Sequence, residues 1–313
     1  MAWDVNGTYS TILIQERAKK IISKHNPETP LFLYVPFQSV HEPFEVPDEY
    51  VEMYANVNDK ARSTYLGMVT AMDDAVGNIT QALKDHGLYD NTIIIWFSDN
   101  GGPEGYEASN WPLRGSKYTL FEGGTRTPAM IHSPTHLPQD LKSDLWIHIS
   151  DWYPTILSMA GLTSTQTGLD GLDQWPQLQD PTLMGQRMEM VYNIHYMGPG
   201  EDDTPVAAIR KGPWKYIKRV NGFIGWTPCP PEICTNSTNN VSELYNEVRD
   251  LLFNVIDDPT ESFNLYEFEP EIVEDLDMLL EEYIAALSDE FYPKPDPSGD
   301  PSNFGGVYSY GWC

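Results

Sequence analysis

The spacing of apolar side chains predicts two helices in the first part of the chain. From 59 to 86 the apolar positions recur every three or four residues, at Tyr65, Met68, Val69, Met72, Val76, Ile79 and Leu83. This period is that of a long amphipathic helix, and Gly87 is expected to end it. A shorter helix is predicted over 11–25, where one face collects Ile14, Ala18, Ile21 and Ile22.

Two continuous apolar runs predict buried strands at 29–37 and 92–97. They read TPLFLYVPF and TIIIWF, and the helix predicted between them gives a crossover long enough for parallel pairing. Strand, helix and strand in this order predict an α/β sheet. Each run ends in a polar, turning segment, QSVHEP after the first and SDNGGP after the second. Because ligands of α/β sheets bind beyond the carboxyl ends of strands, candidate chemistry is expected at these two ends.

The pattern of predicted elements changes in the second half of the chain. Residues 205–220 predict two short strands joined by a Lys-Gly-Pro turn, and 270–287 predict an acidic amphipathic helix with a proline at its start. A core helix is predicted over 148–162, which favours a structural role for its histidine and aspartate. We expect residues 1–199 to belong to a larger α/β domain. Residues 200–313 are expected to form a smaller α+β domain with short antiparallel strands and a terminal helix.

Composition and charge exclude several classes of function. The chain has 313 residues, is 41% hydrophobic, and carries a formal net charge of -27. That charge argues against binding to nucleic-acid phosphates or anionic membranes. An anionic substrate would therefore need a local cluster of cations or a metal. No run of about 18 apolar residues is present, and the first residues lack the basic and apolar regions of a signal peptide.

Sequons and cysteines point to a secreted or lysosomal chain. Four Asn-x-Ser/Thr sequons are expected glycosylation sites, at Asn6, Asn78, Asn236 and Asn240. Cys229 and Cys234 flank Pro-Pro-Glu-Ile and are predicted to form a disulfide, with two free thiols as the alternative. Cys313 is then left without a partner in the chain.

The two strand ends carry candidate metal-binding and acid–base residues. Asp99 and Asn100 offer hard oxygen donors, which suit calcium or magnesium. The alternative is that Asp-Asn-Gly-Gly is only a turn that ends the strand. His41 can bind an anion or protonate a leaving group near neutral pH, or it can be an ordinary hydrogen-bonding histidine.

A glycine-rich basic loop follows the second strand end. Residues 110–126 read NWPLRGSKYTLFEGGTR and place Arg114, Lys117 and Arg126 in an otherwise acidic chain. Cations beside a metal-type loop would neutralise the charge of a sulfate or phosphate ester. A solvated basic loop is the alternative interpretation.

Taken in order, these motifs resemble the arylsulfatases, and most closely the arylsulfatase B type. The resemblance runs from near residue 10 to about 268, and its motifs are LFLYVPFQSVHEPFEVPDEY, GMVTAMDDAVGNITQALKDHGLYDNTIIIWFSDNGG, NWPLRGSKYTLFEGGTR, HISDWYPTIL, AIRKGPWKYI and LFNVIDDPTESFNL. It implies an alkaline-phosphatase-like α/β fold, here with an incomplete central mixed sheet flanked by helices. It also implies a bound calcium and a nucleophile made from a cysteine oxidised to formylglycine.

The resemblance assigns roles to four residues, and the basic loop adds a fifth candidate. Asp99 and Asn100 match two calcium ligands of the family. His41 matches the histidine that contacts the sulfate and assists the leaving oxygen, and Lys117 matches the lysine that clamps the sulfate. Arg114 is expected to contribute to the same substrate-binding loop.

The sequence departs from the family pattern at the nucleophile. The family's modified cysteine lies in Cys-x-Pro-Ser-Arg, and no cysteine of this chain begins that motif. The family's paired aspartates on its first strand are also absent, so only two of four protein ligands for calcium are present. We therefore expect the carboxyl-side part of a sulfatase, inactive by itself, with the signal peptide in the missing amino-terminal part.

The resemblance also implies a substrate class. It predicts a hydrolase of sulfated carbohydrates or aryl sulfate esters, and the B-type likeness suggests 4-sulfated N-acetylgalactosamine. A protein that binds sulfated glycans or a partner without catalysis is the first alternative. A metal phosphoesterase of the same fold is the second.

Overall fold

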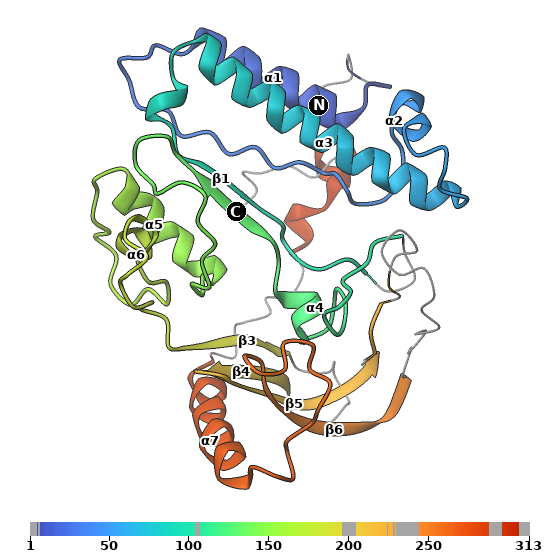
Figure 1. Ribbon diagram of the computed structural model, residues 1–313, viewed down its shortest axis with the longest axis vertical. Helices are drawn as coiled ribbons and strands as arrows, with labels where there is room; N and C mark the ends of the chain where they lie inside the picture. Colours follow the sequence, from blue (N-terminus) through green and yellow to red (C-terminus); the bar gives the residue numbers. More distant parts are fainter. Residues whose placement is uncertain are drawn as a thin grey trace.

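A computed structural model describes residue 5 and residues 7–103, 107–195, 205–223, 225–227, 229, 244–287 and 296–306. Its helices of four residues or more are α1 (Ser10–Lys24), α2 (Asp48–Glu52), α3 (Lys60–Asp85), α4 (Glu122–Thr125), α5 (Trp152–Met159), α6 (Trp175–Gln179), α7 (Pro270–Ala286) and the 3-10 helix η5 (Pro301–Phe304). Three-residue 3-10 turns are η2 (Tyr89–Asn91), η3 (Ile149–Asp151) and η4 (Pro297–Gly299). The strands are β1 (Ile94–Phe97), β2 (Ala129–His132), β3 (Glu189–His195), β4 (Val206–Lys211), β5 (Trp214–Phe223) and β6 (Leu244–Asn254). Figure 1 shows α1 and α3 side by side, with β1 and β2 between them and the sheet of β3 to β6.

The helices predicted from apolar periodicity are confirmed. At the start of α3, Asp59 accepts a hydrogen bond from the Arg62 backbone N–H at 2.9 Å, and Gly87 follows its end with φ +67°. The small and branched side chains of its apolar face pack against α1, with Ile22 1% exposed and Ala75 1% exposed. The predicted core helix and the predicted acidic helix correspond to α5 and α7.

The strand predicted at 29–37 does not form in the described residues. Residues 30–37 have no regular secondary structure, and Phe32 and Tyr34 are each 75% exposed. Leu33 packs against Ile22 and the other residues of the α1–α3 contact, so the segment lies beside these helices. A strand needs a hydrogen-bonding neighbour, and no described strand pairs with this segment. The prediction of a doubly buried strand here was therefore wrong for this chain.

The second predicted strand forms, but its pairing differs from the prediction. β1 pairs with β2 in antiparallel register, from Ile94 opposite His132 to Phe97 opposite Ala129. The apolar side chains of β1 are only half-buried, and Phe97 stacks on Trp152 of α5 at 5.4 Å between ring centroids. The strand end at Ser98 is in turn held by a backbone hydrogen bond to Pro128, so β2 fixes where β1 ends.

The larger sheet is antiparallel throughout, in the order β3-β4-β5-β6. Alternate residues face opposite sides, as a strand requires. One face, with Ile209 and Leu252 fully buried, packs against α7. The opposite face, with Ile217 and Phe253 fully buried, packs against Phe121 just before α4. The loop predicted to bind substrate is therefore attached to this sheet. The sheet begins ahead of the expected domain boundary at residue 200, which stays a prediction.

The packing of α7 on the sheet leads to a stability prediction. Leu280→Ala removes a side chain that is fully buried in the contact with the sheet, so we expect it to lower the free energy of unfolding by about 2–5 kcal/mol. Met278→Ala, on the same helix but 56% exposed, is the matched control and should cost much less. Urea unfolding followed by circular dichroism measures both, and equal losses would contradict the packing described.

Candidate active site

The end of β1 presents the two residues predicted to bind a metal. Asp99 is exposed and Asn100 is half-buried. The Asp99 carboxylate accepts a hydrogen bond from the Asn100 backbone N–H at 2.8 Å, and the Asn100 side-chain amide donates to the Gly101 carbonyl at 3.0 Å. Asp99 Oδ2 and Asn100 Oδ1 have no hydrogen bond among those described, so they are available to a ligand, whereas the Asn100 backbone carbonyl accepts from the Ser98 hydroxyl at 3.2 Å.

The structure brings together His41 and Lys117, which are far apart in the sequence. Lys117 Nζ lies 3.5 Å from His41 Nε2. His41 Nδ1 lies 2.9 Å from the Glu42 carbonyl oxygen. Because a carbonyl can only accept, Nδ1 carries the proton and donates it to Glu42, and Nε2 faces the ammonium group. The two side chains predicted to contact a sulfate therefore point at the same place.

Backbone contacts join the Lys117 loop to the loop that carries Asp99. The Lys117 N–H donates to the Gly102 carbonyl at 3.0 Å, and the Gly101 N–H donates to the Gly124 carbonyl at 3.0 Å. A Cβ on Gly101 would overlap the Gly123 carbonyl oxygen. Only glycine permits so close an approach of two backbones. These contacts place the predicted metal-binding loop directly against the predicted sulfate-binding loop.

Asn110 holds the two loops together and was not identified from the sequence. Its side-chain oxygen accepts from the Gly102 N–H at 2.8 Å, and its amide donates to the carbonyls of Gly102 at 2.8 Å and Gly115 at 3.2 Å. Its own backbone N–H donates to the Thr227 hydroxyl at 2.8 Å. Nothing in its local sequence distinguishes this asparagine from a surface residue of a loop.

Arg114, expected to contribute to substrate binding, lies at the base of the loop in the structure. The residue is 7% exposed, and its guanidinium donates to the Glu261 carbonyl at 2.7 Å. The guanidinium carbon lies 4.6 Å from the Phe121 ring centroid and 4.7 Å from that of Trp226. Cation–π contacts and burial keep this cation among aromatic rings. Arg114 therefore fixes the base of the loop, and its contact with a substrate stays a prediction.

Tyr118 is a second residue that the sequence did not single out. It is 91% exposed, with Lys117 Nζ 5.4 Å from its ring centroid. Its backbone has φ +74°, a left-handed conformation that is uncommon for a bulky side chain. The neighbouring Ser116 and Thr119 enforce that turn, since the Thr119 N–H and hydroxyl donate to the Ser116 carbonyl at 3.0 and 2.8 Å. The backbone turn thus fixes where the Tyr118 side chain begins, and its exposed ring lies beside the Lys117 ammonium.

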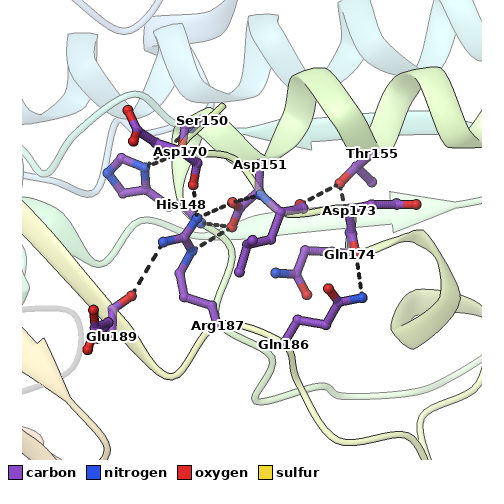
Figure 2. A network of polar contacts seen from close by, with 11 residues as sticks. His148, Ser150, Asp151, Thr155, Asp170, Asp173, Gln174, Gln186, Arg187 and Glu189 are labelled. Carbon is purple, nitrogen blue, oxygen red and sulfur yellow. Dashed lines mark hydrogen bonds and ion pairs between the residues drawn. The ribbon is translucent and has the colours of Figure 1, made fainter. Parts of the chain in front are cut away.

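The histidine and aspartate before α5 have the structural role that the sequence favoured. Figure 2 shows the Arg187 guanidinium against the fully buried Asp151 carboxylate, with Nε 2.9 Å from Oδ2 and Nη2 in contact with Oδ1. The carboxylate also accepts from the backbone N–H groups of His148 and Leu172, each at 2.8 Å. Burial opposes ionisation of Asp151, but these hydrogen bonds outweigh it and hold its pKa below the usual value.

The remaining predicted sites are only partly described. Asn78 is exposed on α3, and its amide donates to the Gln15 side chain at 3.0 Å. Cys229 is disulfide-bonded, and both cysteines that can be its partner, Cys234 and Cys313, lie outside the described residues. Three of the predicted glycosylation sites also lie outside them, namely Asn6, Asn236 and Asn240.

The described residues supply only part of a metal site. Asp99 and Asn100 fit calcium in kind, since both offer hard oxygens, but calcium takes six to eight oxygen ligands. Over the described ranges, no three His, Cys, Asp or Glu side chains come together as a metal site would need. Within the same ranges no helix has the length and apolar character to cross a bilayer.

The Asp151–Arg187 contact leads to a second stability prediction. Asp151→Asn leaves a buried guanidinium without its counter-charge, so we expect a loss of about 3–5 kcal/mol in the free energy of unfolding at neutral pH. The folded-state pKa of Asp151 is depressed, so its contribution is present at neutral pH and is lost as the pH falls through that value. The difference between Asp151→Asn and the parent chain should therefore shrink in acid. Urea unfolding at several pH values measures it, with the exposed Asp90→Asn as control; a constant difference would contradict the assignment.

Comparison with known proteins gives the family of the chain. The family model described as Sulfatase matches residues 2–162. Arylsulfatase J of Mus musculus is 37% identical over 98% of this chain and 54% of its own length. N-acetylgalactosamine-6-sulfatase of Homo sapiens is 30% identical over 81% of this chain and 47% of its own length. The chain thus spans about half the length of the curated relatives it matches.

A solved structure agrees with the fold. The crystal structure of Ps i-CgsB in complex with k-i-k-neocarrahexaose aligns with a TM-score of 0.70 and 28% identity, over 88% of this chain and 55% of that chain. This likeness confirms the predicted alkaline-phosphatase-like sulfatase fold. With the family model covering half of the chain, the conclusion from sequence and structure is the same: the chain belongs to the sulfatase family.

Proposed function

We propose that this chain is the carboxyl-side part of a sulfuric ester hydrolase and that it supplies the sulfate-binding side of the active site. The observation that carries the proposal is the 3.5 Å approach of Lys117 Nζ to His41 Nε2. The backbone bond from Lys117 to Gly102 ties this pair to the loop that carries Asp99. Two potential cations beside a metal-type loop suit an anionic group in a chain whose net charge is -27.

Lys117 and His41 would have different roles in the cleavage of a sulfate ester. The Lys117 ammonium donates hydrogen bonds to sulfuryl oxygens and stabilises their negative charge. His41, with Nδ1–H fixed on the Glu42 carbonyl, presents Nε2 to the ester. When Nε2 is protonated, it would donate its proton to the leaving oxygen as a nucleophile from the proposed missing part bonds to sulfur and the sulfur–oxygen bond breaks, so that the product leaves as a neutral alcohol. A sulfate bound between the two side chains also removes the repulsion between an imidazolium and the nearby ammonium.

Asp99 and Asn100 would hold part of a calcium site. Their free oxygens at the end of β1 have the chemistry for this ion, and the bound ion would draw negative charge from the sulfuryl oxygens. The other ligands must come from outside the described residues. We propose that they belong to an amino-terminal part that this sequence lacks, together with the Cys-x-Pro-Ser-Arg nucleophile. By itself, the chain is then inactive.

A sulfated sugar is the proposed substrate of the intact enzyme. The relatives named N-acetylgalactosamine-6-sulfatase and the complex of Ps i-CgsB with k-i-k-neocarrahexaose support a glycan. The exposed Tyr118 ring, next to Lys117, offers a flat surface for the sugar or aryl ring that carries the sulfate. The 4-sulfate of N-acetylgalactosamine is our first candidate, and the 6-sulfate is the comparison to make.

We propose a lysosomal or secreted location. Cys229 is in a disulfide, and disulfides persist in oxidising compartments. Asn78, in an Asn-x-Thr sequon, has an exposed side chain that a glycan would reach.

A chain that binds sulfated glycans without hydrolysing them is the second candidate. The observation in its favour is that none of the three cysteines starts the nucleophile motif. The upstream transcript separates the two candidates. A continuous reading frame that encodes Cys-x-Pro-Ser-Arg supports the hydrolase, and a verified start at Met1 supports the binding protein.

Binding and turnover test the proposed site. We expect sodium sulfate and 4-nitrocatechol sulfate to bind the chain, and Lys117→Ala and His41→Ala each to weaken binding about 10- to 100-fold, because each removes a charge-assisted hydrogen bond. Lys142→Ala, an exposed lysine elsewhere, should have no effect. Calorimetric titration measures the affinities. Unchanged affinity in Lys117→Ala would contradict the site, and clear turnover of 4-nitrocatechol sulfate with calcium would contradict the proposed inactivity.

The role of Tyr118 is tested by comparing two ligands. Tyr118→Ala should weaken 4-nitrocatechol sulfate about 3- to 10-fold, because a ring stacked on tyrosine is worth about 0.5–1.5 kcal/mol. Sodium sulfate has no ring, so its affinity should stay the same. Tyr118→Phe keeps the stacking surface and is the control. Equal losses for both ligands would show that the side chain supports the loop and does not contact the ring.

A further inference from the structure

Glu261 lies in the turn after β6 and is unusual in both burial and conformation. The residue is 0% exposed, although glutamate is rarely buried unless it is paired. Its backbone has φ +53°, in the left-handed region that favours glycine. A non-glycine residue keeps such a conformation only where the surrounding structure imposes it. Contacts made by Glu261 must therefore stabilise this left-handed backbone conformation.

Glu261 holds both ends of the loop that carries Lys117. At the first end, its carbonyl oxygen accepts from the Arg114 guanidinium at 2.7 Å. At the second end, its side-chain Oε2 accepts from the Glu122 backbone N–H at 2.6 Å. The two ends also meet each other, because the Gly123 N–H donates to the Arg114 carbonyl at 2.6 Å. Glu261 thus joins the two ends of the loop from 114 to 122. We call the contacts of Glu261 with Arg114 and Glu122 the clasp.

A buried lysine fixes the clasp to the sheet. Lys215 Nζ, on β5, lies 2.9 Å from Glu261 Oε1 and 2.9 Å from Glu122 Oε1. These three side chains are at most 2% exposed. Tyr192 on β3 donates its hydroxyl to Glu122 Oε1 at 3.3 Å, and its ring centroid lies 4.5 Å from Lys215 Nζ. The group is therefore packed between the sheet and α4.

The charges in this group are unequal. Two buried carboxylates bind one ammonium, and the Arg210 guanidinium adds positive charge on the Glu122 side of the group. Burial and the nearby Glu122 carboxylate raise the pKa of Glu261 to about 6, while Lys215 holds the pKa of Glu122 below its usual value against the effect of burial. Buried ion pairs of this kind contribute little net stability compared with apolar side chains. Stability alone therefore does not account for the arrangement.

We infer that Glu261 is a positioning residue, which sets the loop from 114 to 122 so that the Lys117 ammonium faces His41. This inference rests on the proposed function for the meaning of that pair, but the clasp itself is a property of the loop. Removing the side chain takes the acceptor from the Glu122 N–H, and this end of the loop is then held by the Lys215–Glu122 ion pair and by the Gly123 N–H bond to the Arg114 carbonyl. The packing of the sheet against α7 lies on its opposite face and does not involve the Glu261 side chain.

Hydrogen exchange of the full chain tests the clasp without any ligand. The reporters are backbone N–H groups with described acceptors in and beside the loop, at Gly115, Lys117, Glu122 and Gly123. In Glu261→Ala we expect exchange of peptides covering 113–124 to rise at least tenfold, since a hydrogen bond to a charged group is lost. Peptides covering β4 and β5 should change only as much as the measured drop in global stability. Glu261→Gln keeps an oxygen for the Glu122 N–H and should restore most of the protection.

Leu280→Ala is the matched control. It weakens the same sheet from the α7 side and touches neither end of the loop. We expect it to speed exchange in the sheet and in the loop together, in proportion to its loss of global stability. If Glu261→Ala gives this same uniform pattern, or leaves loop exchange unchanged, the inference is overturned.

The outcome is separable from that of the proposed function. Loop exchange is measured without sulfate, so the clasp can be established even in a chain that binds no sulfate. Sodium sulfate is then added to the parent chain and to Glu261→Ala. A positioning role is supported if Glu261→Ala binds sulfate more weakly than the parent chain while Leu280→Ala binds it equally well. Equal sulfate affinity in all three chains contradicts that role.

Discussion

The buried ammonium of Lys215 is the interaction on which the rest of the structure depends. It sits on a strand of the large sheet and binds two carboxylates, Glu122 from the start of α4 and Glu261 from the turn after β6. Each group would be costly to bury alone, so their mutual presence is a strong constraint on where these three segments lie. The antiparallel sheet and the loop that carries Lys117 are joined at this point.

Packing on both faces of the sheet, and contacts of the loop with the end of β1, connect this ion-pair group to the candidate active site. Phe121 lies on the same face of the sheet as Lys215, and α7 covers the other face. The loop is then layered on the end of β1 through glycine contacts and the Asn110 side chain, which places Lys117 beside His41. Contacts from the carboxyl-terminal sheet thus bear on the geometry of Lys117, although the described side chains of the sheet that take part are Lys215 and Tyr192.

How far the sequence predicts this structure depends on how local each signal is. The periodicity of α3 and the caps at Asp59 and Gly87 are local, so the long helix was predicted almost to the residue. The prediction of a strand at 29–37 was wrong, because a strand depends on a neighbouring strand that sequence patterns do not show. The α/β fold class itself is confirmed, although β1 pairs antiparallel with β2.

The candidate site shows the same distinction. His41 and Lys117 were identified because the motifs around them resemble a known family, and the structure places them together. The burial of Arg114 was not predicted, because the aromatic rings that surround it include one from a distant segment, and its substrate-binding role stays a prediction. Glu261 gave no signal, since its partners lie between 46 and 147 positions away in the chain. Only contacts across the fold reveal such a residue.

A crystal structure of the chain grown with sodium sulfate tests the central claim most directly. The account predicts a sulfate ion within hydrogen-bond distance of both Lys117 Nζ and His41 Nε2, next to the loop that carries Asp99. A structure in which the two side chains lie apart, or in which sulfate binds elsewhere and leaves them in contact only with solvent, would contradict it.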